Sequence, residues 1–147
     1  MDKQATYDDV NLIIKLYELR REERMREARN FLAGLKPPTT LAEFQAACPP
    51  GSDQNAFVRM VTSYWDMAAS FVTSGVLNQE LFAHNGGELL FVWEKIRDLV
   101  PEMRKAFNMP NYLGHMETVA NTMIANMKRA NPEAYEAFSA RVRAMHA

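Results

Sequence analysis

The clearest helical pattern in the chain is the segment FVRMVTSYWDMAASFVTSGV, residues Phe57–Val76. Its large apolar side chains recur at steps of three and four residues, which places them on one face of an α-helix. The opposite face is polar but almost uncharged, because Asp66 is the only carboxylate between Met60 and Asn78. Surface helices usually carry charged residues on their outer face. We therefore expect this helix to lie in the middle of the domain, covered on more than one side.

The N-terminal part of the chain predicts one long helix and one short helix. Thr6 and Asp9 have the spacing of a capping box, and a mostly helical apolar period follows from residue 7 to residue 32. Gly34 and the following prolines end this helix. A second capping box begins at Thr40 and opens a short helix that stops at Cys48.

The C-terminal half predicts further helices. Residues 78–82 form a turn or two, and residues 88–100 form a strongly apolar helix that kinks or restarts at Pro101. Two one-sided helices then occupy residues 111–146. No strand-like alternation and no internal repeat competes with this pattern. We predict an all-α bundle that forms a single domain over residues 1–147, with about five main helices, one or two short ones, and a core spanning roughly residues 6–107.

Composition limits the class of protein. The chain has 147 residues, of which 24% are charged, and a formal net charge of −1, so bulk charge does not favour nucleic-acid binding. Cys48 is the only cysteine and no signal peptide is apparent, which favours a cytoplasmic protein. The charge-poor segment from Met60 to Asn78 is nearly long enough to span a membrane, but it contains Asp66 and several hydroxyl side chains. We therefore expect no membrane span.

No catalytic or metal motif stands out. The three histidines, His84, His115 and His146, are scattered along the chain, and no Glu-x-x-His pair of the kind used by di-metal bundles is present. Cys48 lies at a predicted helix end without any signature of a nucleophile. We predict no metal, no cofactor and no catalytic residue, and the sequence does not favour an enzyme.

One group of residues could nevertheless form a site. The charged run ELRREERMREAR, residues 18–29, is most simply a solvated helix face, but Arg21 or Arg24 could turn inward and pair with Asp66 or Glu94. Such a pair among aromatic residues could line a small-molecule pocket, or it could be a buried ion pair that fixes helix register. The candidate residues are Tyr17, Arg21, Tyr64, Trp65, Asp66, Trp93 and Glu94.

Three functional hypotheses follow. The first is an interaction or assembly module that self-associates as a homodimer through the methionine-rich C-terminal helices at residues 111–146. The second is a small-molecule-binding protein or enzyme that uses a pocket near Arg21, Asp66 and Glu94. The third is nucleic-acid binding by basic residues after Asn126 together with those of the first helix, although no recognised motif accompanies them.

Four segments carry a resemblance to a known group of proteins. They are Arg20-Arg21-Glu22-Glu23 with Ala28-Arg29, Ser63-Tyr64-Trp65-Asp66 with Ala68-Ala69-Ser70, Gly75-Val76-Leu77-Asn78, and Val92-Trp93-Glu94-Lys95-Ile96. In this order they resemble a family of small bacterial proteins of unknown function, over the chain up to about Leu113. The resemblance implies a helical domain, in some members near membrane segments, without an established activity.

Overall fold

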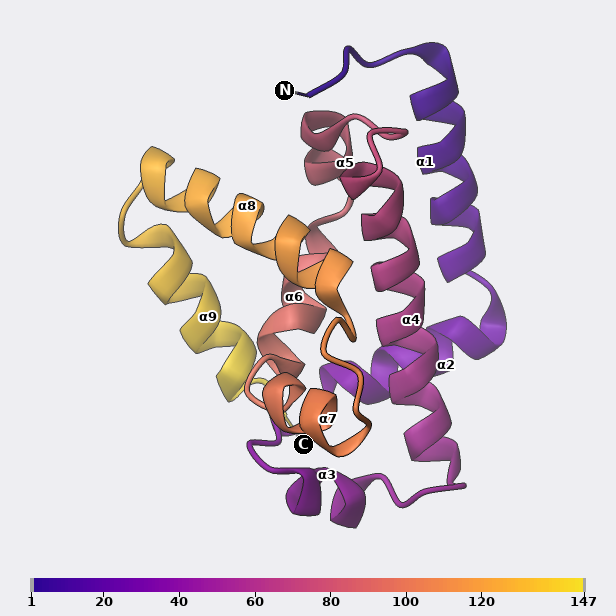
Figure 1. Ribbon diagram of the computed structural model, residues 1–147, viewed down its shortest axis with the longest axis vertical. Helices are drawn as coiled ribbons and strands as arrows, with labels where there is room; N and C mark the ends of the chain where they lie inside the picture. Colours follow the sequence, from indigo (N-terminus) through magenta and orange to yellow (C-terminus); the bar gives the residue numbers. More distant parts are fainter. Residues whose placement is uncertain (1, 147) are drawn as a thin grey trace.

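The computed structural model describes residues 2–146 and folds them into nine α-helices, with no β-strand in that range (Figure 1). The all-α prediction is confirmed. The helices are α1 (Tyr7–Arg20), α2 (Glu23–Ala33), α3 (Leu41–Ala47), α4 (Asp53–Thr73), α5 (Gln79–Asn85), α6 (Gly87–Ile96), α7 (Val100–Ala106), α8 (Gly114–Ala130) and α9 (Ala134–Ala144).

Helix α4 is the central element, as its sequence predicts. Ser52 caps it by accepting a hydrogen bond from the Asn55 N–H at 3.1 Å. Helices α2, α6 and α8 all pack against α4, which explains its lack of outward charge. Even Thr62, on the polar face, is buried, and its hydroxyl donates to the Val58 carbonyl at 2.8 Å.

The prediction of one continuous helix over residues 7–32 is wrong, because the chain turns between α1 and α2 (Figure 1). Glu22 is in an extended conformation, and its carboxylate accepts the N–H groups of Arg24 and Met25, each at 3.0 Å. These two bonds hold the pKa of Glu22 below its usual value. A glutamate therefore caps α2 at a place where neither glycine nor proline marks a break.

The apolar region near residues 88–106 also forms two helices, α6 and α7. The apolar segment that begins at Gly87 ends its first helix at Ile96, and a new helix begins at Val100 with Pro101 in its first turn. Proline lacks an N–H, and the first turn is where that N–H has no partner in the helix. Of the two predicted alternatives at Pro101, a kink or a restart, the structure shows the restart.

The C-terminal helices belong to the core. Helix α8 packs on α4 and α6, and α9 packs on α6 and α8 (Figure 1). Met116, Val119 and Ala120 of α8 are almost completely inaccessible to solvent. The core therefore extends beyond the predicted boundary near residue 107, because the apolar faces of α8 and α9 are used within the fold.

A polar clamp ties the N-terminal segment to the start of α5. The buried carboxylate of Asp9 accepts hydrogen bonds from Lys3 Nζ at 2.5 Å, the Thr6 N–H at 2.7 Å and the Asn78 N–H at 3.1 Å. The ion pair with Lys3, together with these N–H groups, holds the pKa of Asp9 far below its usual range despite its burial. This N-terminal clamp fixes the first turn of α1 against Asn78, the residue that caps α5.

Within residues 2–146, none of the helices has the length and apolar character needed to cross a membrane.

Candidate functional site

The three charged residues predicted to converge have separate partners. Arg21 is exposed and donates to the Tyr17 hydroxyl at 3.0 Å. Asp66 accepts the Met116 N–H at 3.0 Å and so caps the first turn of α8. Glu94 is completely buried and bonds to residues of α9 and to Arg97. The predicted pairing of Arg21 with Asp66 or Glu94 is therefore wrong.

Arg24, the alternative arginine, also stays at the surface. It pairs with Glu27 at 3.0 Å and with Asp53 at 3.3 Å, and its guanidinium lies 4.5 Å from the centroid of the Phe57 ring. It thus covers the start of α4 and does not reach either predicted carboxylate.

The predicted aromatic residues lie in different surroundings. Tyr17 is about half exposed, whereas Tyr64, Trp65 and Trp93 are buried in the core. The Tyr64 hydroxyl donates to the Leu16 carbonyl and joins α4 to α1, and burial raises the pKa of Tyr64 to about 12. Of these four aromatic residues, only Trp65 forms a hydrogen bond to an arginine–carboxylate pair.

That pair is Arg29 with Glu88, which sequence reasoning missed. Arg29 Nε donates to both Glu88 oxygens at 3.1 and 2.9 Å, and Arg29 Nη2 donates to Oε1 at 2.9 Å. The Trp65 indole N–H donates to Glu88 Oε2 at 3.2 Å, and Arg29 Nη1 donates to the Arg20 carbonyl at 3.0 Å. This polar centre links α2, α4, α6 and the end of α1. Both ionic residues were visible in the sequence, but they are 59 positions apart.

A cavity of about 470 Å³ lies beside this pair, between α2 and α6; we call it the α2–α6 pocket. Arg29 and Glu88 supply its charged wall, and the side chains of Leu32, Val61 and Val92 supply its buried apolar wall. Its remaining lining residues are Asn30, Ala33, Gly87, Phe91 and Met145. Small-molecule sites have roughly 300–1,000 Å³ and a few polar groups among apolar walls. The α2–α6 pocket matches this description.

A smaller cavity of about 330 Å³ lies between α1 and the rings of Trp65 and Phe82. The Arg20 guanidinium is 5.3 Å from the ring centroids of both Tyr17 and Trp65, so it bridges α1 and α4 by cation–π contacts. Trp65 thus lines this smaller cavity and contacts Arg20 with its ring, while its N–H binds Glu88 of the α2–α6 pocket.

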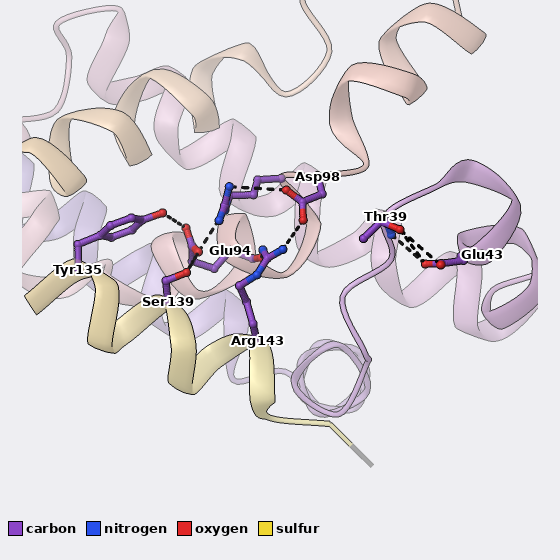
Figure 2. Close-up of polar contacts among 8 residues, drawn as sticks. Thr39, Glu43, Glu94, Asp98, Tyr135, Ser139 and Arg143 are labelled. Atoms are coloured by element: carbon purple, nitrogen blue, oxygen red, sulfur yellow. Dashed lines mark hydrogen bonds and ion pairs between the residues drawn. The ribbon is translucent and has the colours of Figure 1, made fainter.

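Glu94 forms a second polar centre at the junction of α6 and α9 (Figure 2). Its carboxylate accepts hydrogen bonds from the hydroxyls of Tyr135 at 2.5 Å and Ser139 at 2.6 Å, and from Arg97 Nε at 3.1 Å. Burial, followed by the bond to Glu94, raises the pKa of Tyr135 to about 12. Arg143 adds contacts from α9 to Asp98 and to the Glu94 carbonyl. Every oxygen of the buried carboxylate is thus satisfied, and the network fixes α9 to α6.

Lys95 follows Glu94 and is also buried. Its Nζ donates to the carbonyls of Leu35, at 2.7 Å, and Met145. No carboxylate forms an ion pair with it among residues 2–146, and burial lowers its pKa. Lys95 therefore anchors the segment after α9 beside the α2–α6 pocket, where Met145 is a lining residue.

Helix α1 presents an exposed apolar face. Four of its large apolar side chains are exposed: Tyr7, Val10, Ile14 and Tyr17, with exposed fractions of 79%, 40%, 49% and 47%. Ile14 and Tyr17 also border the smaller cavity beneath α1. We call these four residues the α1 stripe. Their spacing of three, four and three residues is that of the seam of a two-helix contact. Only Asp9 and Leu16 of this helix are buried, and Figure 1 shows α1 along the outer edge of the molecule.

The described residues contain no group of three or more His, Cys, Asp or Glu side chains placed to hold a metal ion. His115 instead forms a hydrogen bond of 2.7 Å with the Thr73 hydroxyl. Cys48 is fully buried at the end of α3, and burial raises the pKa of its thiol. A raised pKa keeps the thiol protonated and unreactive.

Comparison with known families gives a match over residues 5–123 to the family described as Domain of unknown function (DUF4760). The matched region contains Arg29, Trp65, Glu88 and Glu94, and it ends before α9. No curated protein and no solved structure shows significant similarity to the chain. Because the match covers well over half of its residues, the chain belongs to the DUF4760 family, a domain of unknown function.

Proposed function

We propose that this domain is an interaction module that self-associates through the α1 stripe. The observation that supports the proposal is the exposure of four large apolar side chains on one helix face at the spacing of a helix–helix seam. The methionine-rich helices offer less surface for this purpose, because Met116 and Met123 are buried within the fold.

The order of the stripe favours a second copy of the same helix as the partner. From either end it reads tyrosine, aliphatic, aliphatic, tyrosine, with the same spacings. A two-fold axis through its centre therefore brings Tyr7 against the partner's Tyr17, and Val10 against the partner's Ile14. Self-complementarity of this kind is what a two-fold dimer requires.

The stripe is only about 15 Å long at roughly 1.5 Å per residue, and so small an interface predicts a dimer of micromolar affinity.

Light scattering coupled to size-exclusion chromatography, from low to high micromolar concentration, tests the proposal. The wild-type chain is expected to approach the dimer mass, and Val10→Glu is expected to remain monomeric. Met67→Glu is the matched control, because Met67 on α4 is also 40% exposed and lies outside the stripe. A wild-type chain that stays monomeric throughout, or a Val10→Glu chain that dimerises like the wild type, would overturn the proposal.

A further inference from the structure

We propose that the α2–α6 pocket binds a small, uncharged, amphipathic molecule, whose hydrogen-bonding head meets Arg29 and Glu88 and whose apolar body lies on α2, α4 and α6. This inference does not depend on self-association, because the pocket and the α1 stripe share no residue.

The pairing of Arg29 with Glu88 determines the charge of the ligand. The guanidinium is held by three hydrogen bonds to one carboxylate, so each charge is already compensated. An anionic ligand would lie beside Glu88, and a cationic ligand beside Arg29, unless the pair were broken. An uncharged ligand avoids both costs.

The wall of the pocket still offers hydrogen bonds. Arg29 Nη1 donates to the Arg20 carbonyl and Nη2 donates to Glu88, and each of these nitrogens carries a second hydrogen that has no acceptor among the described residues. Glu88 can accept further bonds through its remaining lone pairs. A primary amide, which both donates and accepts, complements this pair.

The apolar body has a matching surface. Leu32, Val61 and Val92 are buried side chains from three different helices. Met145 borders the pocket with a half-exposed, flexible side chain, while its backbone carbonyl is held by Lys95. The buried wall is therefore rigid and the outer edge is adaptable, an arrangement that accepts an aliphatic chain.

Three probes with the same chain test the inference: octanamide, octanoate and octylammonium. Binding is followed by NMR through the indole N–H of Trp65, which reports on Glu88, and Trp93→Phe assigns that signal because the chain has only two tryptophans. The wild type is expected to bind octanamide about tenfold more tightly than either charged probe. No binding of octanamide, or a preference for a charged probe, would overturn the inference.

Variants of the pair give a second, directional test. Glu88→Gln leaves the arginine charge uncompensated and is expected to move the preference to octanoate, whereas Arg29→Gln is expected to move it to octylammonium. Ala33→Leu fills the pocket from the partly exposed end of α2 and is expected to weaken octanamide binding about tenfold without unfolding the chain. Equal binding by a folded Ala33→Leu chain would show that the probe binds elsewhere and would refute the assignment.

Discussion

The Tyr135 hydroxyl lies 2.5 Å from Glu94 Oε2, and this hydrogen bond joins the last helix to a carboxylate that has no exposure to solvent. Tyr135→Phe removes the donor but keeps the ring. Because a hydrogen bond to a charged group contributes about 1.5–3 kcal/mol, the free energy of unfolding in urea should fall by that amount. Tyr7→Phe, at a mostly exposed tyrosine, should change it by less than about 0.5 kcal/mol. Equal effects of the two substitutions would contradict a stabilising role for the Tyr135–Glu94 bond.

The two adjacent glycines at the start of α6, Gly86 and Gly87, should respond oppositely to substitution by alanine. A Cβ atom at Gly86 would lie 2.7 Å from Cζ of the buried Phe82 ring, whereas a Cβ atom at Gly87 would have no neighbour within 4 Å. Gly86→Ala should therefore destabilise the fold by about 1–3 kcal/mol through overpacking. Gly87→Ala should stabilise it by about 0.4–1 kcal/mol, because the unfolded chain loses conformational freedom. Thermal unfolding of the two variants checks the sign of each effect.

The N-terminal clamp predicts a loss of stability in acid. The pKa of Asp9 is lowered in the folded state, so its contribution is present above the unfolded value of about 4 and decreases as the pH falls below it. Urea unfolding at successive pH values measures the free energy of unfolding of the wild type and of Asp9→Asn. The difference between these two free energies should shrink as the pH falls from about 4 toward 2. Asp8→Asn, at the neighbouring exposed carboxylate, serves as the control and should follow the wild-type pH profile. If the free energies of unfolding of the wild type and Asp9→Asn differ by the same amount at every pH, the result contradicts the clamp.

Lys95 predicts a rise in stability toward alkaline pH. Burial lowers its pKa in the folded state, so below the unfolded value of about 10.4 the unfolded chain binds more protons than the folded chain. The free energy of unfolding of the wild type should therefore rise relative to that of Lys95→Met as the pH increases from 7 toward about 10. Lys105→Met, at an exposed lysine of α7, is the control: its free energy of unfolding should change with pH in parallel with that of the wild type. A parallel profile for Lys95→Met would mean that Lys95 titrates normally.

The sequence predicted most of the helices because their apolar periods are long and their ends carry standard signals. Thr40 caps α3 as expected, Ser52 caps α4, and Pro101 lies in the first turn of α7. The break between α1 and α2 was not predictable in this way. Its cap is Glu22, a residue type that is ordinary within helices, and the charged residues around it satisfy a helical pattern equally well.

The candidate site was harder to predict, because its members meet only through tertiary packing. The sequence pattern placed Trp65 and Glu94 among seven candidate residues, and it led us to expect an arginine–carboxylate pair near aromatic residues. The expected arginine was Arg21, at the break itself, or Arg24. The observed one is Arg29, which faces Glu88 because α2 changes direction after the break. The partners of Glu94 are 41 and 45 positions away on α9, and no local pattern marks them.

The clamp between Asp9 and Asn78 also has a consequence for synthesis of the chain. These residues are 69 positions apart, so at roughly 5–20 residues per second Asp9 is made about 3–14 s before its partner. During that interval α1 cannot complete its contacts with the body of the domain. Its tyrosines and aliphatic side chains are then the longest-exposed apolar surface of the growing polypeptide, and on a shared messenger they can meet the same helix of a neighbouring chain before either domain has folded.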